Sequence, residues 1–362
     1  MAMDLTNLLK LMVEKGISDI HFKAGACPAV RVNGNLVPAV NIAKVSAADI
    51  EAMAKTIMTP EQSQHWQTSQ EMDLAYSLDG VSRFRVNVFR QRGSAALSLR
   101  VVPIKLKGFA ELNLPQQAFD KLSSESRGLV LFAGITGAGK TTSMNSFVHR
   151  LNETQNARII TIEDPIEFFH EDIKATIVQR EVGRDTASFA GALKQVLRQD
   201  PDIVVIGEMR DVETMQAALT AAETGHLVLS TVHTLDAVQT IDRIVDSFPN
   251  AHAAQVRQQL GLVLKGVIGQ RLVAAKDGRG RYPATEVLIV NSGVRRHIID
   301  SKNNDIYKTM EAGSYYGMHT FDQDLMRLFQ EGKISDKEAL ENATNAEDVQ
   351  LKLRGMGGPP QA

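Results

Sequence analysis

The spacing of apolar residues over the first hundred positions predicts a small domain of mixed helices and strands. Leu5, Leu9 and Met12 recur at helical intervals within residues 3–15, which predicts an amphipathic helix that ends at Gly16. The expected elements that follow are short strands over 17–41 with turns at Gly25 and Asn33-Gly34, helices over 46–67 with a break at Thr59-Pro60, and strands over 71–102. Together they predict an α+β domain over residues 1–105.

One of these strands has a clear two-residue repeat. Its apolar positions are Phe84, Val86 and Val88, and its polar positions are Arg83, Arg85 and Asn87. Because successive side chains point to opposite faces of a strand, we expect the apolar set to be buried and the polar set to share the other face.

The pattern changes at Gly128, where unbroken apolar runs replace alternation. The runs cover residues 129–133, 158–162, 202–206 and 227–232, and helical patterns between them cover 140–152, 186–199 and 211–224. Such runs are typical of strands buried on both faces, so the alternation predicts a parallel sheet covered by helices on each side. A further run over 284–290 precedes a helical pattern that extends to about residue 353. We therefore expect an α/β domain over 128–354, a linker with a short helix over 106–127, and a disordered tail over 355–362.

Composition narrows the functional classes. The formal net charge is −2 and aromatic residues make up 5%, so neither whole-chain attraction to phosphate backbones nor extensive base stacking is expected. A single cysteine, Cys27, excludes an intrachain disulfide and a multi-cysteine zinc site. No run approaches the ~18 apolar residues of a membrane span, and the N-terminus does not have the pattern of a signal peptide. We expect a soluble, cytoplasmic protein.

Residues 134–141 read Gly-Ile-Thr-Gly-Ala-Gly-Lys-Thr and fit the phosphate-binding motif G-x-x-x-x-G-K-[ST]. The motif follows a predicted buried strand and opens a helix, which is the context that it requires. Its backbone N–H groups and the helix N-terminus favour phosphate, Lys140 is expected to reach the β- and γ-phosphates, and the Thr141 hydroxyl is expected to bind Mg²⁺. The residues expected to bind ATP are Gly134, Thr136, Gly137, Ala138, Gly139, Lys140, Thr141 and Thr142.

Two other predicted strands end in carboxylates. Residues 202–206 are followed by Gly207-Glu208, a pattern that suits a strand whose tip meets Mg²⁺ through water. Residues 160–162 are followed by Glu163-Asp164, and hydrolysis requires a group that orients the attacking water. Glu163 and Glu208 both have the chemistry of a base, and the residues alone do not decide between them.

Two histidines flank the run over 227–232. His226 precedes it and His233 follows it. A histidine at a strand edge can sense the γ-phosphate by a hydrogen bond that hydrolysis removes, whereas histidines with a structural role are commoner. Both interpretations stay open on the residues alone.

In this order and spacing, the four segments resemble the secretion-ATPase superfamily that powers type II secretion and type IV pili. Glu163-Asp164-Pro165 resembles the family's aspartate box, Gly207-Glu208 its Walker B motif, and Gly225-His226 through His233 its histidine box. The resemblance implies a homohexamer whose protomers have a small PAS-like α+β N-terminal domain and a RecA-like C-terminal domain with a mostly parallel sheet. It also implies ATP and Mg²⁺ as cofactors.

Several segments are similar to the retraction-type, PilT-like branch of that family. They are Leu-Met-Val-Glu-Lys-Gly-Ile-Ser-Asp-Ile-His at 11–21, Arg-Phe-Arg-Val-Asn at 83–87, Gln-Arg-Glu-Val at 179–182, Arg-Gln-Asp-Pro-Asp at 198–202 and Gly-Glu-Met-Arg-Asp at 207–211. The branch implies a function in pilus retraction and twitching motility, at the cytoplasmic face of the inner membrane. The partners it implies are a membrane-embedded platform protein and other pilus ATPases, and no nucleic acid is expected. Two departures are Ile135, where the family loop usually has proline, and residues 293–300, where the branch usually has Ala-Ile-Arg-Asn-Leu-Ile-Arg-Glu.

The resemblance also assigns roles. It implies that Glu163 is the catalytic base, that Glu208 holds Mg²⁺ through water, and that His226 and His233 belong to the nucleotide site. It implies that N-terminal-domain arginines approach ATP as the ring closes, and the candidates are Arg83, Arg85 and Arg100. The alternatives are an accessory or paralogous pilus or secretion ATPase, a RecA-like nucleic-acid motor, and a nucleotide-binding switch with little turnover.

Overall fold

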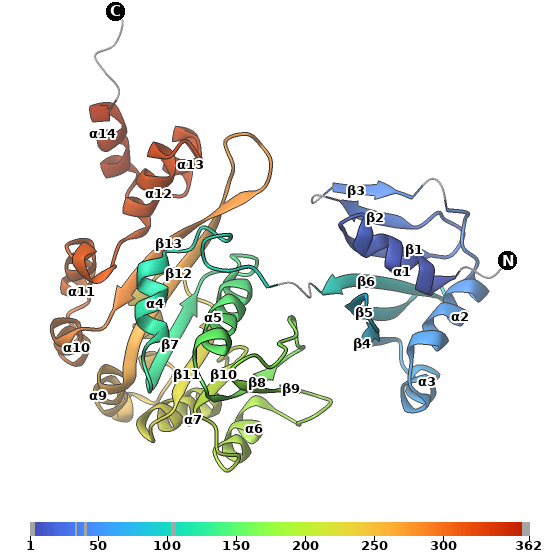
Figure 1. Ribbon diagram of the computed structural model, residues 1–362, viewed down its shortest axis with the longest axis horizontal. Coiled ribbons are helices and arrows are strands. Elements are labelled where there is room, and N and C mark those ends of the chain that lie inside the picture. Colours follow the sequence, from blue (N-terminus) through green and yellow to red (C-terminus); the bar gives the residue numbers. More distant parts are fainter. Residues whose placement is uncertain (1–3, 33–34, 40–41, 103–105, 357–362) are drawn as a thin grey trace, which may run out of the picture. The chain divides into compact units, whose positions relative to one another are not determined.

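The chain folds into two compact units, and each unit has a hydrophobic core of its own. A computed structural model describes residues 4–32, 35–39, 42–102 and 106–356, and it separates into units over Met1–Lys105 and Leu106–Ala362 (Figure 1). Among the described residues, no helix has the length and apolar character needed to cross a bilayer. The predicted turn at Asn33-Gly34 lies outside the described residues.

The described part of the first unit is a six-stranded sheet with helices. The order of strands is β3-β2-β1-β6-β5-β4, with antiparallel neighbours throughout. Its elements are α1 (Leu5–Glu14), β1 (Ile17–Lys23), β2 (Ala29–Val32), β3 (Asn35–Pro38), α2 (Ala47–Ile57), α3 (Pro60–Trp66), β4 (Glu71–Leu78), β5 (Ser82–Gln91) and β6 (Ser94–Val102). Phe84, Val86 and Val88 of β5 are buried in its core, as the alternation predicts.

The second unit is built on a seven-stranded sheet within the described residues. Its order is β13-β12-β7-β11-β10-β8-β9, and every pair is parallel except β12 with β13. The strands are β7 (Gly128–Ala133), β8 (Arg158–Glu163), β9 (Thr176–Glu181), β10 (Ile203–Ile206), β11 (Leu227–Val232), β12 (Leu264–Ala274) and β13 (Arg281–Ile289). The expected mostly parallel α/β sheet is confirmed.

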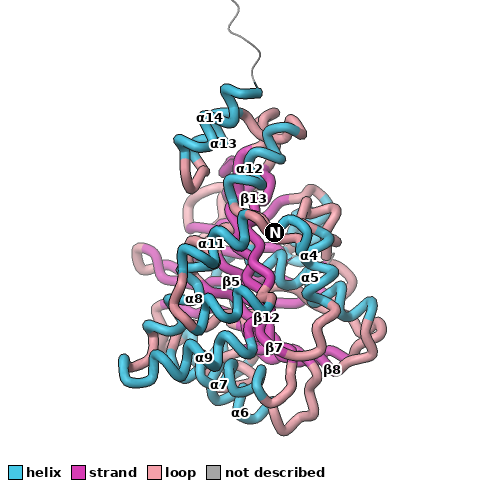
Figure 2. The backbone as a smooth tube through the Cα atoms, turned by 90° about the vertical axis from the view of Figure 1, so that its left-hand side faces the viewer, coloured by secondary structure: helices cyan, strands magenta, loops and turns pink. Residues whose placement is uncertain are grey.

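Helices cover both faces of this sheet. Figure 2 shows α4 (Gln116–Ser123) and α5 (Lys140–Thr154) on one side of β7 and β12, and α8 (Ala237–Asp246) and α9 (Ala253–Val263) on the other. The remaining helices are α6 (Phe189–Val196), α7 (Val212–Glu223), α10 (Ser292–Ile299), α11 (Asn303–Glu311), α12 (Phe321–Gln330), α13 (Asp336–Glu341) and α14 (Ala346–Met356), with short 3₁₀ turns at Asn250–His252 and Ser314–Tyr316. The predicted tail begins within the last turn of α14, and its remainder lies outside the described residues.

The segment expected to be a linker contributes to the core of the second unit. Phe109 stacks edge to face on Phe119 of α4, with ring centroids 4.8 Å apart, and Phe119 lies 5.9 Å from Phe147 of α5. The short helix expected within residues 106–127 corresponds to α4, and the residues before it pack on the second unit.

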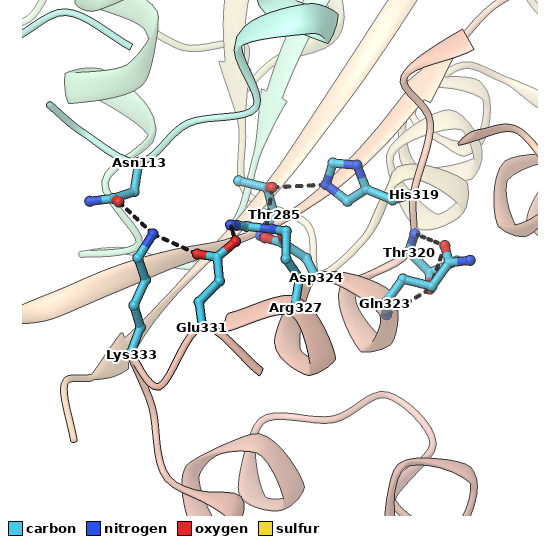
Figure 3. Close-up of polar contacts among 9 residues, drawn as sticks. All are labelled: Asn113, Thr285, His319, Thr320, Gln323, Asp324, Arg327, Glu331 and Lys333. Atoms are coloured by element: carbon cyan, nitrogen blue, oxygen red, sulfur yellow. Dashed lines mark hydrogen bonds and ion pairs between the residues drawn. The ribbon is translucent and has the colours of Figure 1, made fainter. Parts of the chain in front are cut away.

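A polar network ties the same segment to the C-terminal helices. Lys333 Nζ donates to Asn113 Oδ1 (2.9 Å) and pairs with Glu331 (2.7 Å), which also accepts from Arg327 (Figure 3). Arg327 Nε in turn donates to the buried Asp324 carboxylate at 2.7 Å. The start of the second unit is therefore fixed against α12.

Candidate active site

The phosphate-binding loop lies between β7 and α5. Gly134, Gly137 and Gly139 have φ values of 153°, 81° and 90°, a region that side chains rarely adopt. Close approach adds to the requirement at Gly134, because a Cβ there would lie 2.6 Å from the backbone oxygen of Gln270. The glycines therefore set the path that turns backbone N–H groups toward an anion at the start of α5.

Lys140 points back over the loop. Its Nζ donates to the backbone oxygens of Gly134 (2.8 Å) and Ile135 (2.9 Å), and the side chain is 6% exposed. Burial lowers the pKa of Lys140, while the carboxylates of Glu208 and Glu167 oppose that shift. The ammonium is thus held against the backbone of the phosphate-binding loop. Thr136, Ala138, Thr141 and Thr142 lie on the same loop and first helical turn.

Glu208 follows β10 and faces two cationic or polar side chains. Arg210 Nε lies 2.7 Å and His233 Nε2 3.3 Å from Glu208 Oε2. β10 and β11 pair in parallel, so the residues that follow them meet at the same edge of the sheet. The structure thus brings together the predicted residues Glu208 and His233, and it adds Arg210, which sequence reasoning did not single out.

Glu163 is the last residue of β8 and is 4% exposed. Its Oε1 accepts from the Thr161 hydroxyl (2.7 Å) and from Gln179 Nε2 (3.1 Å). Burial raises the pKa of Glu163, and these two donors oppose the shift. A carboxyl whose pKa is raised by burial at the edge of a nucleotide site is a candidate base.

The structure places His226 at the end of β11 opposite to the end that meets the phosphate loop. His226 precedes β11, and its backbone carbonyl accepts from Gly128 at the start of β7, whereas the phosphate loop follows the end of β7. Six residues of strand, or about 20 Å, separate the two ends. The ring lies instead near the end of α7, with Nδ1 3.0 Å from the Ala221 carbonyl.

The three arginines of the first unit share one face of its sheet. Arg85 of β5 and Arg100 of β6 are directly paired, and Arg83 lies two residues along β5. Their surroundings differ: Arg83 is 7% exposed, Arg85 is exposed, and Arg100 Nε donates to the buried Asp19 carboxylate at 2.7 Å.

Gln270 is a further residue at the loop that the sequence did not indicate. The Ser143 hydroxyl of α5 donates to Gln270 Oε1 at 2.7 Å, and the backbone oxygen of Gln270 approaches Gly134. β12 was missing from the predicted strands because two glycines and two basic residues interrupt its apolar run. Without that strand, no signal connected Gln270 to the phosphate loop.

A groove of about 680 Å³ opens beside the loop. Ile135 and Thr136 line one side, His233 lies at the end of β11, and α8 contributes Gln239 and Arg243. The groove is continuous with residues of the phosphate loop, so it offers room for the parts of a nucleotide beyond the bound phosphates.

Comparison with known protein families shows which family the chain belongs to. The family described as "Type II/IV secretion system protein" matches residues 1–340. The chain belongs to this family. In Pseudomonas aeruginosa, the type IV pilus retraction ATPase PilT is 42% identical over 341 residues, which cover 94% of this chain and 98% of PilT. The type IV pilus ATPase PilU of the same organism is 39% identical over 352 residues, covering 97% of this chain and 92% of PilU.

Solved structures agree with this relationship. The crystal structure of the pilus retraction motor PilT with bound ADP matches with a TM-score of 0.90 and 40% identity, over 96% of this chain and 99% of that one. The Legionella pneumophila ATPase DotB matches with a TM-score of 0.76 and 27% identity, over 97% and 93% of the two chains. The fold expected from the resemblance is confirmed, including the small N-terminal unit before the P-loop unit.

Proposed function

We propose that the chain is an ATPase whose turnover drives the retraction of type IV pili. The observation that carries this proposal is a phosphate loop beside two strand-end carboxylates, Glu163 and Glu208, in a chain 42% identical to a pilus retraction ATPase over 94% of its length. The reaction is ATP hydrolysis to ADP and phosphate, coupled to mechanical work in twitching motility.

The environments of the two carboxylates support different roles. Burial raises the pKa of Glu163, which suits a base that takes a proton from the attacking water. Glu208 lies against Arg210 and His233 at the end of β10, a position that suits a carboxylate holding a Mg²⁺-bound water. This asymmetry favours Glu163 as the base and leaves Glu208 with the metal.

The donor set fits Mg²⁺ that arrives with the nucleotide. Among the described residues, no group of three or more His, Cys, Asp or Glu side chains forms a metal cage. A hydroxyl on Thr141, a carboxylate on Glu208 and the phosphates themselves are the oxygen ligands that Mg²⁺ uses in such sites. When bound, the ion neutralises charge on the phosphates, and Lys140 adds a second positive charge.

The working form is proposed to be a homohexamer at the cytoplasmic face of the inner membrane. An arginine from the first unit of a neighbouring protomer would stabilise charge on the transferred phosphoryl group. Arg85 suits that role because it is exposed, whereas Arg100 is paired with Asp19 and Arg83 is buried. The partners are a pilus platform protein in the membrane and other pilus ATPases.

A second candidate is an accessory or paralogous pilus ATPase. The similarity to PilU, 39% over 97% of the chain, is almost as high as the similarity to PilT. The residues of α10, Gly-Val-Arg-Arg-His-Ile-Ile-Asp over 293–300, also depart from the retraction-branch pattern. Retraction in cells that lack every other pilus ATPase would distinguish a principal motor from an accessory one.

The test is Mg·ATP turnover per protomer across a dilution series, with particle size measured in the same samples. Turnover per protomer that rises as hexamers form supports a site completed between protomers. A constant rate for the monomer would contradict the trans-arginine role, and stimulation by single-stranded DNA would favour a nucleic-acid motor. Lys140→Ala and Glu208→Ala are each expected to lower turnover at least about a hundredfold and to abolish retraction.

A further inference from the structure

The segment between β8 and β9 is bound along the phosphate-loop helix by two buried asparagines. Asn145 and Asn152 of α5 are 3% and 1% exposed, and they lie seven residues apart, about two helical turns. Asn152 Nδ2 donates to the Glu171 carbonyl (2.7 Å), and its Oδ1 accepts from Ile173 N (3.0 Å). The path of the residues that follow Glu163 is therefore set by α5.

His170 makes the second contact, nearer to the phosphate loop. Its Nε2 lies 2.8 Å from Asn145 Oδ1, and Asn145 Nδ2 donates to the backbone oxygen of Thr141 (2.9 Å). Because the amide group donates to Thr141, its oxygen must accept, so His170 carries its proton on Nε2. Burial lowers the pKa of His170 to about 4, which keeps the ring neutral at pH 7.

Gln179 of β9 connects His170 with Glu163. Its Oε1 accepts from the backbone N–H of His170 (3.0 Å), and its Nε2 donates to the Phe168 carbonyl (2.8 Å) and to Glu163 Oε1 (3.1 Å). Both the oxygen and the nitrogen of the Gln179 amide form hydrogen bonds, so the amide cannot rotate without losing them. The first turn of α5 is thus linked to the Glu163 carboxylate through three side chains.

We propose that Gln179 is a positioning residue for Glu163, and that Asn145 and His170 make its position depend on the first turn of the phosphate-loop helix. This inference depends on the proposed function, in which Glu163 is the base. A shift of the first turn of α5 on nucleotide binding would be passed to the carboxylate by hydrogen bonds rather than by rearrangement of the sheet.

Other charged groups surround the same edge of the sheet. Glu167 lies in the segment after Glu163, Glu181 is paired with Glu163 on β9, and Lys140 and Glu208 lie toward the phosphate loop. Burial and the charge of Glu167 raise the pKa of Glu163, and each hydrogen-bond donor to its carboxylate lowers it. Removal of the Gln179 amide therefore makes the base harder to ionise as well as less well oriented.

The test compares Gln179→Met with wild type. Methionine keeps the length and loses every hydrogen bond, so we expect kcat to fall about tenfold or more while KM for ATP stays within about twofold. The acidic limb of the kcat–pH profile should move to higher pH by about half a unit or more. The matched control is Gln155→Met, which removes a donor to the Ser123 carbonyl (2.6 Å) and is expected to change neither quantity.

Each result bears on the inference. An unchanged kcat, or a lowered kcat with an unmoved acidic limb, would show that Gln179 is only structural and would overturn it. If Gln179→Met fails to fold by circular dichroism, His170→Phe replaces it, since it breaks the contact with Asn145 and keeps the backbone donor; the same limb should move in the same direction. Full activity of Glu163→Gln would refute the role of Glu163 as base and this inference with it, but not the proposed function. No ATP turnover by the wild type would refute the proposed function itself. Loss of activity in Glu163→Gln alone would leave the function standing.

Discussion

Glu286 offers a test of how burial controls ionisation in this fold. It lies on β13, is 1% exposed, and accepts from the backbone N–H of Ala237 (2.8 Å) at the start of α8. Burial raises the pKa of its carboxyl to about 7, Asp236 adds to the rise, and Arg271 opposes it. A group with this pKa should make the stability of the second unit depend on pH in the neutral range.

The sign and size of this pH dependence follow from the linkage between proton binding and folding. Below pH ~4.5 the carboxyl is protonated in both the folded and the unfolded chain, so its contribution to folding is fully present. As pH rises toward 7, the unfolded chain ionises first, and stability is lost. The difference between 4.5 and about 7 corresponds to about 3 kcal/mol, since one pKa unit is about 1.4 kcal/mol.

The variant Glu286→Gln keeps an acceptor for Ala237 and cannot ionise. Chemical denaturation of wild type and variant, followed by circular dichroism at pH 5 and pH 8, should show the variant gaining about 3 kcal/mol relative to wild type at the higher pH. Glu213→Gln is the matched control, because Glu213 is 65% exposed and should show no such change. Parallel pH dependences for wild type and Glu286→Gln would refute the reasoning.

Two other substitutions probe the phosphate loop and the first unit. Gly134→Ala places a Cβ 2.6 Å from the backbone oxygen of Gln270 at a φ of 153°, so we expect binding of a fluorescent ATP analogue to weaken at least about tenfold with the fold retained. Unchanged affinity would contradict the close-approach argument. Asp19→Ala leaves Arg100 without its buried partner and should destabilise the first unit by about 1–3 kcal/mol, which Trp66 fluorescence can follow because that tryptophan is buried in the same core. A loss below about 0.5 kcal/mol would mean that the pair contributes little.

Much of the fold could be predicted from periodicity. The runs that became β7, β8, β10 and β11 were recognised because burial on both faces leaves few polar positions in a strand. β9 was missed because its Thr-Ile-Val-Gln-Arg-Glu sequence is half-buried at the sheet edge and ends in polar residues. An edge strand has no strong hydrophobic signal, since one side of it has no neighbour to pack against.

The site was predictable only where one local motif carries its chemistry. The phosphate loop is contiguous, so its glycines and Lys140 could be found directly. Gln179 and Gln270 reach their partners from other strands of the sheet, and no local pattern predicts such contacts. Arg210 lies only two residues after Glu208, and no motif marked it. His226 and His233 are close in sequence, yet the whole length of β11 separates them.

Strand order also explains why chain order could not rank the two carboxylates. Spatially, β11, β10 and β8 follow β7 in that order, so Glu208 is two strand spacings, about 10 Å, from the phosphate-loop strand, and Glu163 is three, about 14 Å. The more distant carboxylate can serve the nucleotide only if the segment after it stays against the helix that carries the loop. The contact between His170 and Asn145 at 2.8 Å maintains that approach. The strand farthest from the phosphate loop, β9, then supplies Gln179, which donates a hydrogen bond to the Glu163 carboxylate. The edge strand that was not predicted from the sequence therefore supports the residue on which hydrolysis is proposed to depend.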